Sequence, residues 1–277
     1  MNDIILTVII PFCLKDKTRI NALEHVLSCI KNQDLRVHNT NIKNWEFIFV
    51  EQVVNIDSEN CKQYTQGIAD RHLLLEYDGE FNKSWCMNVG AREATGDWVV
   101  FVDADMLFGK EYLYFANLWR SRTPIKFFIG WETIIKLPGK SEPVARLIRN
   151  TVLTAGGVFW CRKDFYWELG GMNENYFGYG GEDNDFWVRA NFIIGENKEL
   201  NNVQHCPYPM VHIYHDDAIP SPERFYHLDR VIEYPEKMIE KLTQANLGYP
   251  SSPTKVFVDD LQLKKQSLAN KEGRGII

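Results

Sequence analysis

Four short apolar runs, separated by segments long enough for a helix, are the strongest constraint on how this chain can fold. The runs are Ile4–Ile10, Trp45–Val50, Leu73–Tyr77 and Trp98–Val102. Each has the length of a buried strand, and apolar residues recur at helical spacing between Ile20 and Ile30. Ser84 is expected to cap a further helix that runs to Ala94. This alternation predicts βαβ units, and therefore an α/β fold with a mostly parallel central sheet flanked by helices.

The second half of the chain has a less regular pattern. We expect helices at Lys110–Arg120, Asp164–Leu169, Glu182–Ala190 and Pro222–Leu242, strands at Phe127–Trp131, Val158–Cys161 and Val203–Tyr214, and a loop at Leu137–Pro143. This pattern predicts one catalytic domain over residues 1–231, with a nucleotide-binding half (1–105) and an acceptor half (106–231). Residues 232–277 are expected to form a helical, charged tail.

Composition excludes several classes of protein. The net charge of −6 argues against a nucleic-acid-binding protein, which is normally basic. The sequence has no run of about 20 apolar residues, so we expect no transmembrane span. The N-terminus lacks the features of a signal peptide. The six cysteines include no C-x-x-C pair and are expected to be reduced, which fits the cytoplasm and leaves peripheral contact with the inner face of a membrane open.

An acidic triplet, Asp103-Ala104-Asp105, follows the fourth apolar run directly. Open α/β sheets bind ligands beyond the carboxyl ends of their strands. In an extended segment the two aspartates would project to the same side, one toward a metal and the other toward a sugar. Oxygen ligands of this kind suit Mg²⁺ or Mn²⁺, which would bridge a diphosphate. The alternative is a solvated pair of carboxylates at a strand end.

A glycine-rich turn leads into a second acidic pair, Glu182-Asp183, in the stretch YFGYGGEDNDFW. The pair falls in the first turn of an expected helix, where backbone N–H groups and the helix dipole favour ionised carboxylates. Asp183 is the candidate general base for a sugar hydroxyl, and Glu182 would orient it or bind the acceptor. The simpler interpretation is an acidic helix cap. Aromatic rings in this stretch could stack on a sugar; they are Tyr176, Phe177, Tyr179 and Trp187.

Three histidines, His205, His212 and His215, lie within eleven positions. An imidazole could complete a Mn²⁺ site begun by Asp105, and in an extended strand only one of His212 and His215 would face that site. A separate zinc site with Cys206 is an alternative, although the spacing matches no usual zinc pattern. Lys83, at the start of the expected helix, could reach nucleotide phosphates, and an exposed lysine without a specific role is an equal alternative. Gly156 and Gly157 would let the backbone approach a donor sugar, or would simply form a turn.

Taken in order, these segments resemble glycosyltransferases of the GT-A fold, a Rossmann-like fold that binds nucleotide-diphospho-sugars. The resemblance is to the β-1,4-galactosyltransferase-like group, and the N-terminal half is also similar to glycosyltransferase family 2. It spans Leu6 to Val231 and is carried by seven segments in the same order: VIIPF, FIFVEQ, FNKSWCMNVG, FVDADM, AGGVFWCRKDF, GGMNENYFGYGGEDND and PSPERF.

The resemblance implies roles for individual residues. Those implied to bind the donor are Pro11, Phe12, Phe81, Lys83, Asp103, Asp105 and Gly157. Asp183 would be the base, with Tyr179, Gly181 and Glu182 beside the sugars. Asp105 and a histidine would hold the metal: alignment of PSPERF without gaps favours His212, and the aromatic-His-acid context favours His215.

The chain departs from the family pattern at four positions. Cys13 and Lys15 replace arginines that often follow the Pro-Phe pair, which puts the uridine and phosphate contacts in question. Thr154 replaces an aromatic residue and would make room for an N-acetyl group on the donor. Asn184 replaces a second carboxylate after the base.

Together with the resemblance, these observations predict an inverting, Mn²⁺- or Mg²⁺-dependent transferase that moves a hexose or N-acetylhexosamine, and the resemblance favours Gal or GalNAc. The donor would be a UDP-sugar, and the acceptor a glycan or lipid-linked saccharide, as in bacterial synthesis of surface polysaccharides. Alternatives are a retaining transferase of the same fold, a non-catalytic sugar- or Ca²⁺-binding module, and a nucleotidyltransferase. A nucleotidyltransferase would need a glycine-rich basic phosphate loop near the first strand, and this sequence has none there.

Overall fold

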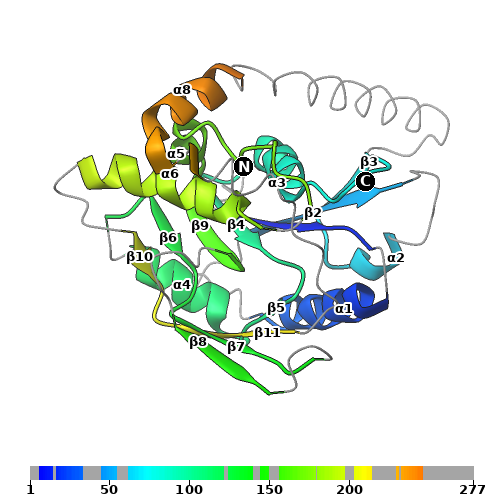
Figure 1. Cartoon of the computed structure of the whole chain (residues 1–277). Coiled ribbons are helices and arrows are strands. Elements are labelled where there is room, and N and C mark those ends of the chain that lie inside the picture. Colours follow the sequence, from blue (N-terminus) through cyan, green and yellow to red (C-terminus); the bar gives the residue numbers. More distant parts are fainter. Residues whose placement is uncertain are drawn as a thin grey trace.

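A computed structural model describes residues 6–14, 17–33, 45–54, 62–121, 124–139, 144–149, 156–178, 180–196, 203–213, 229–230 and 232–245. Two sheets organise this part of the chain (Figure 1). The larger has seven strands in the order β10-β6-β9-β4-β1-β2-β3, and the smaller has four in the order β5-β11-β7-β8. The larger sheet contains strands from both sides of residue 105, so the two predicted halves of the chain, 1–105 and 106–231, share one core.

The predicted strands of the first half are confirmed. They are β1 (Leu6–Phe12), β2 (Trp45–Val53), β3 (Arg71–Glu76) and β4 (Trp98–Val102). β1 pairs in parallel with both β2 and β4, and β2 pairs in parallel with β3. Every residue of β1, β2 and β4 is buried, which explains why these strands are continuous apolar runs rather than alternating ones.

The helices of the first half are α1 (Lys17–Lys31), α2 (Lys62–Thr65) and α3 (Lys83–Glu93), and α4 (Tyr112–Ser121) follows at the start of the second half. The expected cap of α3 was wrong by two residues. Asn82 is the N-cap, because its side-chain oxygen accepts from the backbone N–H of Trp85 at 2.9 Å. Ser84 is fully buried inside the first turn. In Figure 1, α1 and α4 cover one face of the large sheet, and α3, α5 (Lys163–Glu168) and α6 (Glu182–Glu196) cover the other.

The mostly parallel sheet contains one reversed strand among those described. β9 (Val158–Arg162) lies between β4 and β6 (Phe127–Ile129) and is antiparallel to both. Beyond β6, β10 (Gln204–His205) is again parallel. Aromatic rings fill the core beside these strands: Trp160 stacks on Phe128, and Phe159 stacks on Phe186 of α6, with ring centroids 5.4 Å apart in both pairs.

The smaller sheet was not predicted as a separate unit. It contains β5 (Met106–Leu107), β7 (Thr133–Lys136), β8 (Arg146–Arg149) and β11 (Pro209–His212). The single strand expected at Val203–Tyr214 is two strands: β10 joins the large sheet and β11 joins the small one. The chain changes sheets at Cys206–Tyr208, where the Tyr208 N–H donates to the carbonyl of Cys206 at 2.7 Å. The turn therefore separates His205 from His212.

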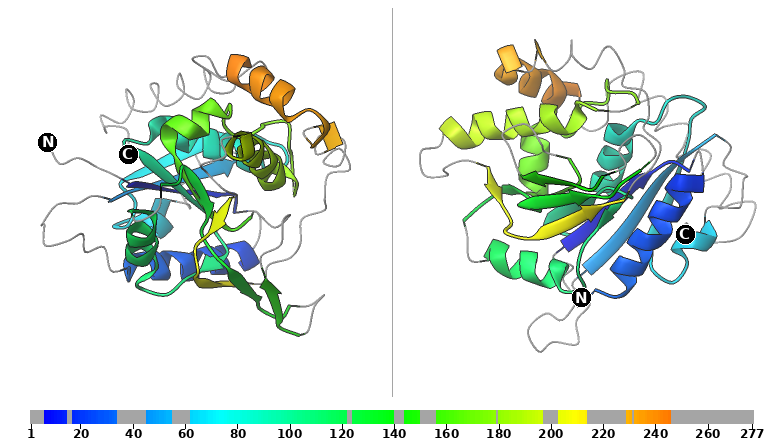
Figure 2. Two further views of the ribbon diagram at one scale, coloured as in Figure 1. Left: turned by 90° about the vertical axis from the view of Figure 1, so that its left-hand side faces the viewer. Right: turned by 60° about the horizontal axis from the view of Figure 1, so that its bottom comes forward.

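The C-terminal part of the description is α8 (Pro235–Ala245), which packs against α5 and α6. Residues 229–230 and 232–233 are also helical, but Tyr234 is not, so the single helix expected at Pro222–Leu242 is interrupted before Pro235; residues 222–228 lie outside the described part. Figure 2 shows α8 on the side of the molecule opposite the β7–β8 hairpin. No helix in the described ranges is both long enough and apolar enough to cross a bilayer. The five described cysteines are free thiols.

Candidate active site

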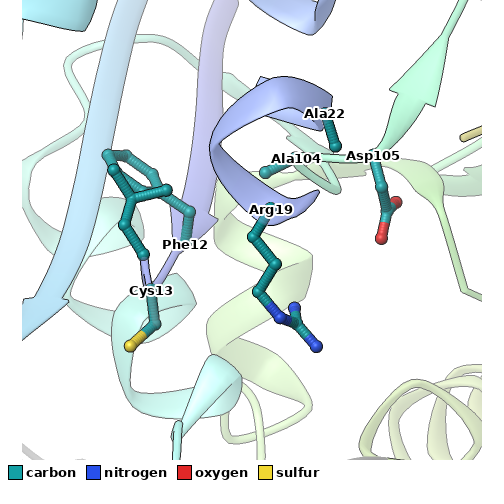
Figure 3. A pocket seen from close by; sticks show the side chains of 7 residues that line it. Phe12, Cys13, Arg19, Ala22, Ala104 and Asp105 are labelled. Atoms are coloured by element: carbon teal, nitrogen blue, oxygen red, sulfur yellow. The ribbon is translucent and has the colours of Figure 1, made fainter. Parts of the chain in front are cut away.

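The strand order of the large sheet predicts where a ligand binds. Successive strands run outward from β1 to β2 and β3 on one side, while β4 lies on the other side of β1. Such a reversal leaves a crevice beyond the carboxyl ends of the two diverging strands. A pocket lies at this point (Figure 3), lined by Phe12, Cys13, Leu14, Arg19, Ala22, Ala104 and Asp105. Its lining comes from the segments that follow β1 and β4 and from α1.

Arg19 is the residue of this pocket that the sequence analysis missed. It lies in the first turns of α1, seven residues beyond Phe12, and its side chain extends to the same side of the pocket as that of Asp105 (Figure 3). A guanidinium here supplies the positive charge that Cys13 cannot. Its spacing on the amphipathic helix could have revealed it, because Arg19 lies four residues before the inward-facing Leu23.

Next to this pocket, the ammonium group of Lys83 contacts three carboxylates from distant parts of the chain. Lys83 Nζ lies 2.8 Å from Asp103 Oδ1, 2.9 Å from Asp183 Oδ2 and 3.3 Å from Glu182 Oε1. These side chains are 10–24% exposed. The predicted acidic sites after β4 and at the start of α6 therefore form one cluster, and Lys83 is directed at carboxylates in this structure. We call Lys83, Asp103, Glu182 and Asp183 the carboxylate cluster.

The carboxylate cluster carries more negative than positive charge. With all four groups ionised, three carboxylates face one ammonium. Burial raises the pKa of Asp103 to about 7, with Asp183 and Asp105 adding to the effect and Lys83 opposing it. Burial, with the neighbouring Asp183, also raises the pKa of Glu182 to about 7. Burial would lower the pKa of Lys83, but the three carboxylates together raise it well above its usual value. The excess of negative charge therefore favours the binding of a further positive charge at the carboxylate cluster.

Two glycines hold the backbone close to the carboxylate cluster. Gly157 has a φ of +96°, and its N–H donates to Asp103 Oδ2 at 3.1 Å. A Cβ added to Gly156 would lie 2.9 Å from Asp183 Oδ2, closer than real Cβ contacts come. Trp131 fixes this segment, because its Nε1–H donates to the carbonyl of Gly156 at 2.9 Å. The groups that these glycines approach in this structure are Asp103 and Asp183, while the predicted approach to a donor sugar stays a prediction.

Asp105 points away from the carboxylate cluster. A turn spans residues 103–106, with the Met106 N–H donating to the carbonyl of Asp103, so the expected extended segment was wrong. The turn sends Asp103 to Lys83 and Asp105 to β11, where Asp105 Oδ2 lies 3.7 Å from His212 Nε2. The backbone strengthens this contact, since the Ile213 N–H donates to the carbonyl of Asp105 at 2.8 Å.

The pair of Asp105 and His212 fits a divalent cation. Two ligands at about 2.1 Å from one ion can lie up to about 4.2 Å apart, and carboxylate with imidazole suits Mn²⁺. Ions that serve nucleotides take their remaining ligands from phosphates and water. Among the described residues, no group of three His, Cys, Asp or Glu side chains could hold a metal. The zinc alternative with His205 and Cys206 therefore has no support there.

The remaining predicted residues divide into three sets. Pro11 is buried within β1, and Phe81 supports the glycine-rich turn, since its carbonyl accepts from the Gly178 N–H at 2.9 Å. Gly181 has a φ of +101° and precedes α6 directly, where its carbonyl accepts from the Asp185 N–H. Tyr179, His215, Lys15 and Thr154 lie outside the described residues.

Comparison with known proteins gives two family matches along the chain. Residues 7–115 match the model described as "Glycosyl transferase family 2", and residues 149–216 match "N-terminal domain of galactosyltransferase". The first contains β1–β4 with Lys83 and Asp103, and the second contains α6 with Glu182 and Asp183. No curated protein sequence matches the chain.

Solved structures share the fold at low sequence identity. S. aureus TarS (residues 1–349) in complex with UDP-GlcNAc has a TM-score of 0.59 at 16% identity, covering 97% of this chain and 74% of that one. GalNAc-T7 with UDP, GalNAc and Mn²⁺ has a TM-score of 0.57 at 14% identity, covering 99% and 59%. The mannosyltransferase PcManGT from Pyrobaculum calidifontis, in complex with GDP-Man and Mn²⁺, has a TM-score of 0.52 at 15% identity, covering 97% and 81%.

Proposed function

Since this chain is a glycosyltransferase of the GT-A fold, we propose that it moves a hexose or N-acetylhexosamine from a UDP-sugar to a hydroxyl of a glycan, with inversion. Gal and GalNAc are the favoured sugars. The observation that carries the proposal is the carboxylate cluster beside the pocket at the β1–β4 crevice. It places a fixed carboxylate, Asp183, next to the crevice where open α/β sheets bind their ligands. The proposed catalytic domain is residues 1–231, and α8 supports it by packing on α6.

The donor would bind with its nucleotide in the pocket lined by Phe12 and Ala104. The Arg19 guanidinium would face the phosphates, because it is the basic side chain in that lining. Asp105 and His212 would hold Mn²⁺ or Mg²⁺. When bound, this ion neutralises the charge that develops on the departing diphosphate. The structural neighbours crystallised with Mn²⁺ and a nucleotide support this arrangement.

Asp183 would remove the proton from the attacking hydroxyl of the acceptor. Its Oδ2 is held by Lys83, while its Oδ1 is buried and makes no hydrogen bond with the described residues. A hydroxyl that enters the cluster would find an acceptor there. Lys83 keeps Asp183 oriented, and the raised pKa values of Asp103 and Glu182 reduce the negative charge around it near neutral pH.

Replacement of the base tests the proposal. Asp183→Asn keeps the shape of the side chain and is expected to lower kcat by about 10²- to 10⁴-fold, while UDP binding stays nearly unchanged. Asp164→Asn is the matched control, since Asp164 is an exposed acid in the first turn of α5. Unchanged turnover by Asp183→Asn would remove the base assignment. NMR of the product separates inversion from retention of the anomeric configuration.

The thermal shift caused by UDP, measured first with Mn²⁺ and then with EDTA, tests the donor site. A ligand that binds only the native state raises the melting temperature according to its occupancy. We expect a Mn²⁺-dependent shift that His212→Ala reduces and Arg19→Ala nearly abolishes. Absence of any shift, together with glycan binding that needs no nucleotide, would instead favour a sugar-binding module.

A further inference from the structure

The β7–β8 hairpin forms the outer edge of the small sheet and projects from the body of the molecule (Figure 2). Its apolar side chains are unusually exposed. Val144 is 71% exposed, Leu147 59%, Ile135 39% and Leu137 37%. These are four of the seven large hydrophobic residues that are exposed in the described part of the chain. Single exposed apolar residues need no explanation, but a group on one hairpin marks an interaction surface.

Strand register puts two of these side chains on one face. Ile135 of β7 pairs with Leu147 of β8, while Ile134 pairs with Ile148 on the opposite face. Ile134 is buried and Ile148 is partly buried against the core, so the Ile134–Ile148 face points inward. The Ile135–Leu147 face therefore points away from the protein. It presents an apolar surface that nothing in the described chain covers.

Basic residues lie on both faces of this hairpin. Arg149, opposite Thr133, shares the face of Ile135 and Leu147, whereas Lys136 and Arg146 pair with each other on the opposite face, beside the connection between the two strands. Arg146 and Arg149 are exposed. Three cations on a short hairpin are opposite in sign to the whole chain, which carries a net charge of −6. Charges on an edge strand also prevent pairing with other strands, but this need explains the arginines and not the exposed Val144 and Leu147.

We propose that the β7–β8 hairpin docks on a lipid bilayer that contains anionic headgroups. Long basic side chains would contact the headgroup phosphates while Leu147 and Ile135 enter the boundary with the acyl chains. A soluble anionic polymer would use the cations alone. The apolar face favours a surface that offers negative charge and hydrocarbon together.

The hairpin is joined directly to the candidate active site. β7 pairs with β11, and the Leu137 N–H donates to the carbonyl of His212 at 3.0 Å. If the proposed function holds, docking would bring the site to the membrane surface, where a lipid-linked saccharide presents its sugar. Binding to vesicles needs neither donor nor turnover, so its failure is distinguishable from failure of the proposed function.

Vesicle sedimentation of the full chain tests the proposal. We expect binding to vesicles of phosphatidylcholine with about one-third phosphatidylglycerol, little binding to phosphatidylcholine alone, and weaker binding at high salt. Arg149→Glu and Leu147→Ser should each weaken binding about tenfold. The matched control is Ile232→Ser with Lys241→Glu, which changes exposed residues near and on α8. It should bind as the wild type does.

Three outcomes would overturn the proposal. The first is no binding to the anionic vesicles. The second is equal binding of the wild type and Leu147→Ser, because loss through Arg149→Glu alone indicates a soluble polyanion as the partner. The third is weakening by the control variant equal to that by the hairpin variants. Circular dichroism of each variant checks that the exposed substitutions leave the fold intact.

Discussion

Helix α6 carries two carboxylates two residues apart, Asp183 and Asp185, in opposite electrostatic surroundings. Asp185 is fully buried and matched by one cation: Arg189 Nη2 lies 2.6 Å from Asp185 Oδ1, and Asn173 donates to the other oxygen at 3.0 Å. Arg189 Nε also donates to Asp185 Oδ1, at 2.7 Å, and Nη1 donates to the carbonyls of Leu169 and Gly171. Asp183 instead shares Lys83 with two other carboxylates.

The difference separates a structural ion pair from a candidate catalytic group. In the pair of Asp185 and Arg189 one cation matches one carboxylate, so charge is balanced, and the contacts of Arg189 with Leu169 and Gly171 fix the segment that precedes α6. In the carboxylate cluster, negative charge is in excess and an oxygen of Asp183 has no hydrogen-bond partner among the described residues. Perturbed and unbalanced charge in a cleft is typical of functional sites.

The largest effect should come from breaking the balanced pair. Asp185→Ala leaves Arg189 buried with its charge unmatched, and the free energy of unfolding should fall by about 3–5 kcal/mol. Asp183→Ala removes a surplus charge, so its effect on stability should be below about 1 kcal/mol or slightly favourable. Urea unfolding of both variants measures this contrast. Equal destabilisation by the two would mean that both aspartates are structural.

Removing the cation of the carboxylate cluster should give a smaller, pH-dependent effect. The raised pKa values of Asp103 and Glu182 mean that the native state holds their protons more tightly than the unfolded state does. Their contribution to stability is therefore present below about pH 4 and is lost as the pH rises to about 7. In Lys83→Met the carboxylates have no counter-ion, and the loss should extend to higher pH.

We expect Lys83→Met to lower the free energy of unfolding by about 3 kcal/mol at pH 8 and by clearly less at pH 6. Urea titrations of wild type and variant at both pH values measure the difference. Lys126→Met is the control, since Lys126 pairs with Glu168 at the surface and should contribute at most about 1 kcal/mol at either pH. A pH-independent loss in Lys83→Met would contradict a shared titration of the carboxylates.

The sequence predicted the parts of the site that depend on local rules. Buried strands are recognisable in the sequence as apolar runs. An acidic pair after three glycines predicts a helix start, as found at Glu182. The position of Asp103 beyond β4 follows from the general location of ligands in open sheets.

What the sequence could not give depends on contacts between distant segments. Lys83 and Asp183 are 100 residues apart, and only the tertiary fold brings the ammonium at the start of α3 to the carboxylate in the first turn of α6. The turn at Asp103–Met106 was hidden because the triplet follows a strand without a glycine or proline. The change of sheet at Cys206–Tyr208 did carry a local signal that the sequence analysis did not use, since Pro207 lies within it and Pro209 follows it.

The smallest effect should come from adding one methyl group beside Asp183. In Gly156→Ala the new Cβ would lie 2.9 Å from Asp183 Oδ2, and Trp131 limits how far the backbone can retreat. Displacement of the carboxylate should lower kcat about tenfold, equivalent to about 1.4 kcal/mol, while the melting temperature and UDP binding stay near those of the wild type. The control is Gly195→Ala, near the C-terminal end of α6. No atom lies within 4 Å of its added Cβ, so this variant should leave kcat unchanged. If Gly156→Ala were fully active, Asp183 would tolerate movement that a general base does not, and the contrast with the rigid Asp185 would rest on charge alone.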